Sequence, residues 1–127
     1  MSEQHYQAGM ELRRSMWGEA GAEPRVNQAT PFNRPLEDMV TTWCFGDIWQ
    51  RPGLDRRTRS MITLAALTAL CRPNQLKGHV EGAIANGVTV EEIREILLHT
   101  SVYSGIPTGV EAFAAAKEVL RKLGLDG

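Results

Sequence analysis

The sequence predicts an all-α protein, and three observations carry this prediction. Apolar residues recur at spacings of three and four through most of the 127 residues, as on one face of a helix. No segment holds the alternating pattern, bounded by turn residues, that a β-hairpin needs. Proline, glycine and asparagine stand between the periodic segments, where helices end and begin. We expect a bundle of about six helices.

In the first half of the chain the pattern predicts two helices and a loop. The first helix covers about Tyr6 to Trp17 and ends near Gly18. The segment from Glu23 to Pro35 has no periodicity, so it is expected to be a loop. The second helix runs from about Leu36 to Gln50, where Arg51-Pro52-Gly53 breaks it.

The third helix is expected to lie at the centre of the fold. Asp55 can cap its first turn, and its residues up to Leu70 are apolar nearly all round. Pro73 marks its end, and Asn74 can cap the next helix. That fourth helix, about 75–85, is short and rich in small residues.

The last two helices have the strongest end signals. Asn86-Gly87 predicts a left-handed stop, and Thr89 with Glu92 forms a capping box that starts the fifth helix. Gly105-Ile106-Pro107 breaks it, and the sixth helix, about 108–123, ends at Gly124.

Composition bounds the partners and the compartment. A 43% hydrophobic share in 127 residues suits one domain, 1–127, with a modest core. The 14 basic and 15 acidic residues nearly cancel, so no overall field draws the chain to nucleic acid or to an anionic membrane. No apolar run is long enough to span a bilayer, and the start lacks the order of a signal peptide. We therefore expect a cytoplasmic protein with neither partner.

Small residues in the fourth and sixth helices, together with the apolar third helix, favour an oligomer. Close packing of helices from different copies would explain both features. The alternative is that Gly78, Gly82, Ala114 and Ala115 only let helices of one chain approach each other.

Several kinds of chemistry lose support. The chain has no glycine-rich phosphate loop, no paired zinc-ligand dyads and no Gly-x-Ser-x-Gly motif. His5, His79 and His99 lie in separate segments, so no metal site is predicted. Cys44 and Cys71 are expected to be reduced thiols rather than a disulfide.

His79 is the candidate catalytic residue. It lies on a short helix rich in alanine and glycine, and an imidazole can give or take a proton near neutral pH. The alternative is a histidine satisfied by a backbone carbonyl, or an exposed one. His5 and His99 are expected at the surface.

The candidate anion-binding residues come from an arginine cluster around Pro52-Gly53. Arginine forks bind carboxylates, and the cluster can supply two of them. We expect Arg51 and Arg59 to point inward, because Arg59 shares a helix face with apolar residues, whereas Arg56 and Arg57 lie nearer the helix start. The alternative for any of them is a solvated charge.

Aromatic residues lie beside these arginines. Trp43, Phe45 and Trp49 are candidates for the wall of a dry pocket, in which electrostatic interactions are stronger than in water. The alternative is that they belong to the hydrophobic core.

Ordered motifs resemble those of the gamma-carboxymuconolactone decarboxylase family over nearly the whole chain. They are Thr-Pro-Phe-Asn at 30–33, Gly-Asp-Ile-Trp-x-Arg-Pro-Gly-Leu at 46–54, Thr-Arg-Ser at 58–60, Leu-Lys-x-His at 76–79, Asn-Gly-Val-Thr at 86–89, Glu-Glu-Ile at 91–93 and Val-Tyr-x-Gly-x-Pro at 102–107. Each is weak singly, but their order and spacing together are specific.

The resemblance implies a fold of the alkylhydroperoxidase-D type, assembled as a homotrimer or homohexamer with sites near subunit contacts. It implies loss of carbon dioxide from 4-carboxymuconolactone, a small carboxylated lactone, to give 3-oxoadipate enol-lactone in protocatechuate catabolism, without a cofactor or metal. For this reaction we expect Arg51 and Arg59 to be catalytic by holding the anions, and His79 to be catalytic as proton donor or as a partner of the oxyanion. Trp43, Phe45, Trp49 and Tyr103 would bind the substrate.

Two departures leave the substrate open. Phe45 stands where the family usually has tryptophan, and Ser104 where cysteine is common. The alternatives are a family member that acts on a different lactone, a quinone-like compound or a cyclase-type substrate, and a non-catalytic oligomeric binding protein. Peroxidase chemistry like that of a sister branch is not expected, because the positions of its cysteine pair hold Arg72 and Gln75.

Overall fold

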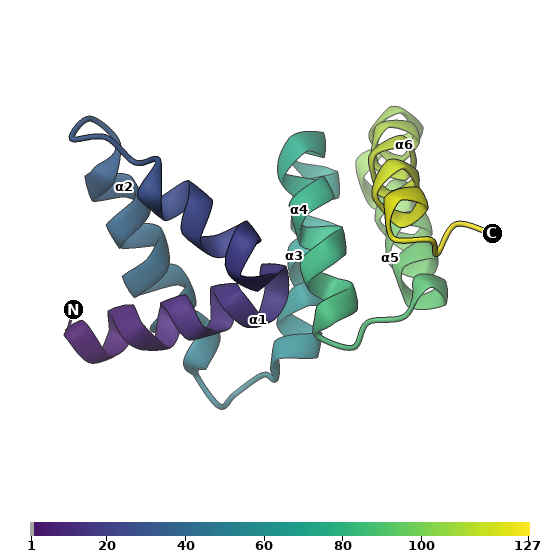
Figure 1. The fold of residues 1–127 in the computed structure, drawn as a ribbon. Coiled ribbons are helices and arrows are strands. Elements are labelled where there is room, and N and C mark those ends of the chain that lie inside the picture. Colours follow the sequence, from purple (N-terminus) through teal and green to yellow (C-terminus); the bar gives the residue numbers. More distant parts are fainter. Residues whose placement is uncertain (1) are drawn as a thin grey trace. The chain divides into compact units, whose positions relative to one another are not determined.

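The computed structural model describes residues 2–127, except for the side chains of 20–24, and these residues contain helices and no strand (Figure 1). This confirms the all-α prediction. The chain divides into two compact units, an N-terminal unit up to Asp55 and a C-terminal unit from Arg56 onward. Each is described by itself, and the single domain over 1–127 stays a prediction.

In the N-terminal unit, α1 (Glu3–Asn27) packs against the segment that follows α2 (Figure 1). Gly18 interrupts α1 with φ 71° and ψ 176°, so the predicted stop there is a kink, after which the chain turns helical again. The predicted loop from Glu23 is therefore wrong up to Asn27, because helix continues to that residue.

The predicted helix from Leu36 to Gln50 is wrong as one continuous element. The chain forms α2 (Arg34–Met39), then a π-helix, η1 (Val40–Phe45), and a single 3-10 turn, η2 (Ile48–Gln50). The apolar spacing of a π-helix differs little from that of an α-helix over six residues, so the periodicity did not reveal the change.

The π-helix packs against α1 at two glycines. A Cβ atom on Gly9 would overlap the carbonyl oxygen of Thr41, and one on Gly46 would overlap the carbonyl oxygen of His5. Backbone therefore lies against backbone at both points, which only glycine allows.

A buried ion pair lies beside this contact. Arg13 is 1% exposed and donates to Glu37 at 3.3 Å and to the Thr41 hydroxyl at 2.8 Å. Arg25 also donates to Glu37, at 3.4 Å. Burial lowers the pKa of Arg13, as does the nearby charge of Arg25, whereas Glu37 raises it.

In the C-terminal unit, α3 (Arg56–Ala69) and α6 (Ile106–Lys122) each contact both α4 (Pro73–Ala85) and α5 (Val90–Ser104). Leu64 of α3 lies in the shared core. The third helix is thus central to this unit, but it is not buried all round, because Ile62 remains 51% exposed. The core also contains Leu76, Val80, Ile93, Leu97, Ala112 and Leu120.

The helix ends of this unit mostly follow the prediction. Thr89 and Glu92 form the capping box, and Gly87, Gly105 and Gly124 have positive φ. One cap was wrong: α4 begins at Pro73, with Arg72 as its N-cap residue, and Asn74 lies inside the first turn. Proline at the first position of a helix has no N–H to leave unpaired, so it begins α4 instead of only ending α3.

Cys71 closes α3 in a left-handed conformation, with φ 55°. Its N–H donates to Thr68 O at 3.1 Å, and the N–H of Arg72 donates to Leu67 O at 2.9 Å. This is the hydrogen-bond pattern of a Schellman motif, with cysteine in the position that glycine usually takes. Both cysteines are free, as predicted.

We expect Gly46→Ala to destabilise the protein by about 1–3 kcal/mol, because the new methyl group must push α1 away from the π-helix. Chemical denaturation monitored by circular dichroism measures the change. Gly53→Ala is the matched control, since a Cβ atom there meets no atom within 4 Å. Equal stability of the two variants would show that the glycine contact does not constrain the fold.

We expect Cys71→Gly to stabilise the protein by about 0.5–1 kcal/mol, because glycine adopts positive φ without the clash of a Cβ atom. The shift in denaturation midpoint measures it. Cys71→Ala removes the thiol but keeps the Cβ atom, so it should give no gain; a gain of the same size would assign the effect to the thiol instead.

Candidate functional site

In the N-terminal unit, Phe45 and Trp49 lie in a small hydrophobic core with Leu12 and Met16. The ring centroids of Phe45 and Trp49 are 5.7 Å apart, and Trp17 packs edge-on against Phe45 at 5.6 Å. Both candidates are buried, at 4% and 7% exposure. The structure thus brings these two predicted residues together, and as part of a core.

Trp43 and Arg51 occupy more open positions in the same unit. Trp43 lies on the π-helix and is 50% exposed. Arg51 is exposed and follows η2 in extended backbone, with φ −67° and ψ 137°. The Gln50 side chain fixes this turn by donating to Phe45 O at 3.0 Å and to Ala8 O at 3.3 Å.

Cys44 lies between these aromatic residues, half-buried on the π-helix. Burial raises the pKa of its thiol, while a hydrogen bond with Trp49 and the charge of Arg13 oppose the rise. The thiol therefore stays protonated at neutral pH, which disfavours nucleophilic or redox chemistry at this position.

In the C-terminal unit, Arg59 and His79 lie on two helices that pack together, α3 and α4. Both side chains are half-buried, and the Nδ1 atom of His79 is shielded from solvent. The positions three and four residues further on are Gly82 and Ala83, so small residues follow the imidazole on its face of α4. An imidazole and a guanidinium on adjacent helices can supply a proton and hold an anion.

Tyr103 lies near the end of α5 and is 81% exposed. Its ring contacts that of His99, one turn earlier, with centroids 5.2 Å apart. His99 is exposed, as predicted.

Arg57, which was not chosen as a candidate, joins α3 to the turn before α5. It forms an ion pair with Glu92 and donates to Gly87 O at 3.3 Å. Asn86 donates to the buried Ser60 hydroxyl at 3.0 Å in the same region. The Asn-Gly-Val-Thr motif and one arginine of the cluster thus have structural roles.

Ser104, one of the two departures noted in the sequence, has local hydrogen bonds. Its hydroxyl donates to Thr100 O at 2.9 Å and lies 2.6 Å from the Thr108 hydroxyl. It therefore links the end of α5 to the start of α6.

Sequence reasoning missed the buried network of Arg13, Glu37 and Thr41 and the π-helix beside it. One signal was present: Arg13 stands directly after Leu12 and three residues before Met16, on the part of α1 that packs inward. An arginine in such a position needs a buried carboxylate partner, but the sequence does not say which one.

Among the described residues, no group of three or more histidine, cysteine or acidic side chains is placed to hold a metal ion. In the same part of the chain, no helix combines the length and apolar character needed to cross a membrane.

These features define a small all-α protein that carries an imidazole and a guanidinium on adjacent helices. The chain belongs to the carboxymuconolactone decarboxylase family, whose sequence model matches residues 34–118. The match begins at the first residue of α2 and ends within α6. The all-helical fold agrees with the alkylhydroperoxidase-D type that the resemblance implied.

Two relatives cover most of the chain. The 4-carboxymuconolactone decarboxylase of Acinetobacter baylyi is 37% identical over 97% of this chain and 92% of its own length. The nitrosuccinic acid decarboxylase npaB of Metarhizium robertsii is 39% identical over 93% of this chain and 82% of its own length. Both are named decarboxylases, and their names give different substrates.

Proposed function

We propose that this protein is a carboxy-lyase that removes carbon dioxide from 4-carboxymuconolactone to give 3-oxoadipate enol-lactone without a cofactor. The observation that carries the proposal is the 37% identity, over 97% of the chain, to a relative named for this reaction. The half-buried His79 and Arg59 on adjacent helices support it, because the reaction needs a proton donor and a group that holds an anion.

The substrate can serve as its own electron sink. Its departing carboxylate is attached to the gamma carbon of an unsaturated lactone. When the bond to carbon dioxide breaks, its electron pair spreads through the double bond onto the lactone carbonyl oxygen. A proton then adds to the ring carbon next to that carbonyl, which completes the balance with no external oxidant or reductant.

In this proposal Arg51 and Arg59 hold the carboxylates and the growing oxyanion, and His79 delivers the proton. Trp43, Phe45, Trp49 and Tyr103 shape the site and exclude water. The buried position of Phe45 and Trp49 makes their contribution indirect, through the core that supports the turn before Arg51.

A second candidate substrate is nitrosuccinate, which the 39% identity to the Metarhizium relative favours. The two substrates share a chemical skeleton. In each, the carbon that loses carboxylate also bears a CH2–COO⁻ group and is joined to an electron acceptor, the unsaturated lactone or the nitro group. A site with two carboxylate-binding arginines and one proton donor suits both.

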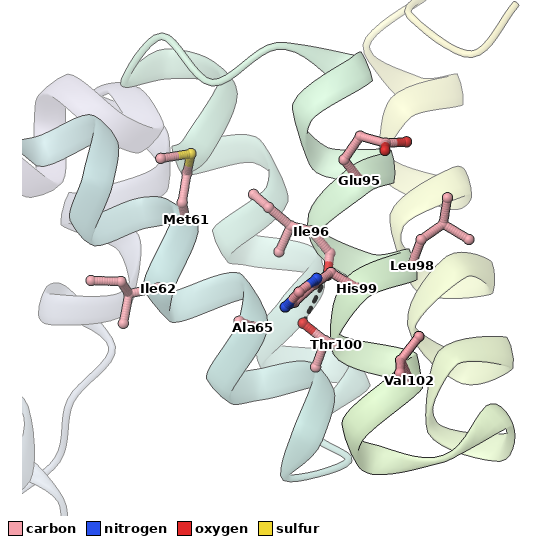
Figure 2. Close-up of a pocket in the computed structure, with 9 residues that line it drawn as sticks. All are labelled: Met61, Ile62, Ala65, Glu95, Ile96, Leu98, His99, Thr100 and Val102. Carbon is pink, nitrogen blue, oxygen red and sulfur yellow. Dashed lines mark hydrogen bonds between the residues drawn. The ribbon is translucent and has the colours of Figure 1, made fainter.

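We further propose that the protein acts in the cytoplasm as a homotrimer or homohexamer. An apolar surface on the C-terminal unit supports assembly. Figure 2 shows its open groove between α3 and α5, which Met61, Ile62, Ile96 and His99 help to line. Val102, Ile62 and Leu98 also line this groove and are 77%, 51% and 49% exposed, so together they form an apolar patch of the kind that marks an interface.

The function is tested by ultraviolet assay of the purified protein with fresh 4-carboxymuconolactone and, separately, with nitrosuccinate. We expect His79→Ala to lower kcat at least 100-fold, because proton transfer in the transition state is lost. His5→Ala, which removes a histidine from the other unit, should keep kcat within twofold. Full turnover by a folded His79→Ala protein would exclude the proposed role of His79.

The assays with the two substrates distinguish between the two candidate reactions. A kcat/KM at least 100-fold higher for the lactone supports the main proposal, and the reverse ratio supports the nitro acid. If the folded oligomer turns over neither compound, two alternatives are better interpretations. One is a family member that acts on a different lactone or a quinone-like compound, and the other is a non-catalytic binding protein.

We expect Arg59→Gln to lower kcat/KM about 10- to 100-fold, which corresponds to the loss of one charge-assisted hydrogen bond. Steady-state kinetics measures it. Arg72→Gln removes an exposed arginine at the start of α4 and should have no effect. An equal loss in both variants would indicate a general effect of charge instead of substrate contact.

We expect Val102→Glu to reduce the size of the assembly, because a charge buried in an apolar interface is costly. Light scattering coupled to size-exclusion chromatography measures the mass. Val102→Thr keeps the shape of the side chain and should assemble as the parent does. An unchanged mass for Val102→Glu would place the interface elsewhere.

A further inference from the structure

A second pocket lies wholly within the C-terminal unit, between α5, α6 and the segment 125–127. Its volume is about 700 Å³, which is within the range of small-molecule sites. None of the residues assigned to catalysis above lines it. It therefore needs an explanation separate from the proposed reaction.

The floor of this pocket is apolar. Ile93, Leu97 and Leu120 come from the core of the unit, and Phe113 of α6 adds an aromatic ring. Ala114 and Ala116 have side chains too small to fill the space between the helices. An aliphatic or aromatic group placed there would leave water without displacing a protein side chain.

One wall is the segment after α6, which two contacts hold in place. The N–H of Leu125 donates to Leu120 O at 2.7 Å. The Asp126 carboxylate pairs with Arg121 at 3.0 Å, so its charge is already neutralised.

The remaining charges favour an anion. Arg94 of α5 and Lys117 of α6 line the pocket from its two helices, and both are exposed. Neither forms an ion pair or hydrogen bond with any side chain that the structure describes. Glu91 is the opposing charge, and it lies in the first turn of α5, where the helix dipole offsets it.

We propose that this pocket binds a small apolar carboxylate, with its hydrocarbon part on the Leu97–Phe113 floor and its carboxylate between Arg94 and Lys117. The two cations are long and flexible, so they can reach a common anion from opposite walls. The apolar floor supplies the affinity, and the cations select a carboxylate over a neutral compound of the same shape. The proposal goes beyond the decarboxylase activity and does not depend on it.

The test uses the ¹⁵N-labelled protein, titrated with octanoate and followed by amide shifts in two-dimensional NMR. We expect saturable shifts at Leu97, Ala114 and Lys117, with a dissociation constant of about 1 mM, as the size of the ligand allows. Octan-1-ol, the neutral probe of matched length, should bind about tenfold more weakly. The Arg94→Gln/Lys117→Gln protein should bind octanoate about tenfold more weakly than the parent.

Two further variants sharpen the result. Arg34→Gln/Arg72→Gln removes two exposed cations that do not line the pocket and should bind octanoate as the parent does. Ala114→Phe fills the pocket from an exposed position and should abolish binding of both probes. Three outcomes would each overturn the proposal. The amide shifts could fail to saturate, or the two probes could bind with equal affinity. The amides that line the pocket could also show no shift, because a second copy of the chain covers them.

Discussion

Backbone contact between α1 and the π-helix at Gly9 and Gly46 is the constraint on which the N-terminal unit depends. Because no side chain separates the two segments there, the π-helix is held at a fixed distance and rotation. Arg13 secures the same junction from inside, through Glu37 and Thr41. Phe45 is the last residue of that fixed segment, and Trp49 and then Arg51 follow it closely in the chain. Gly46, the glycine of the Gly-Asp-Ile-Trp motif, thus has a packing role, although the same motif contains the candidate substrate-binding residue Trp49.

The C-terminal unit depends on a different kind of junction. Glu92 accepts the backbone N–H of Thr89 in the capping box and also pairs with Arg57. A single carboxylate therefore starts α5 and ties it to the first turn of α3. Because Arg59 is on that same turn, the junction also helps to position one of the two candidate catalytic side chains, while His79 lies on α4, which packs against α3.

The sequence predicted the C-terminal unit better than the N-terminal unit, and the reason is physical. The signals at Thr89, Gly87 and Gly105 act over three or four residues, so they can be read without the tertiary structure. The π-helix and the burial of Arg13 depend on contacts between segments about 30 residues apart, for which a single sequence holds no local signal. The same limit applies to the site: His79 and Arg59 were predicted by residue type and helix face, whereas Phe45 and Trp49 could be either core or pocket wall.

The π-helix also affects how the chain can change in length. Relative to an α-helix, a π-helix has about one extra residue in a turn, so such a turn can hold an added residue without rotating the helix on either side of it. Removing one residue between Val40 and Phe45 would let that turn close to α-helical winding, with α2 keeping its face relative to the aromatic residues that follow. A one-codon deletion there would therefore shorten the segment while Leu36 and Met39 stay in register with the downstream motif. The segment is therefore a point at which we expect the chain to tolerate a change of one residue in length without moving the residues around Trp49.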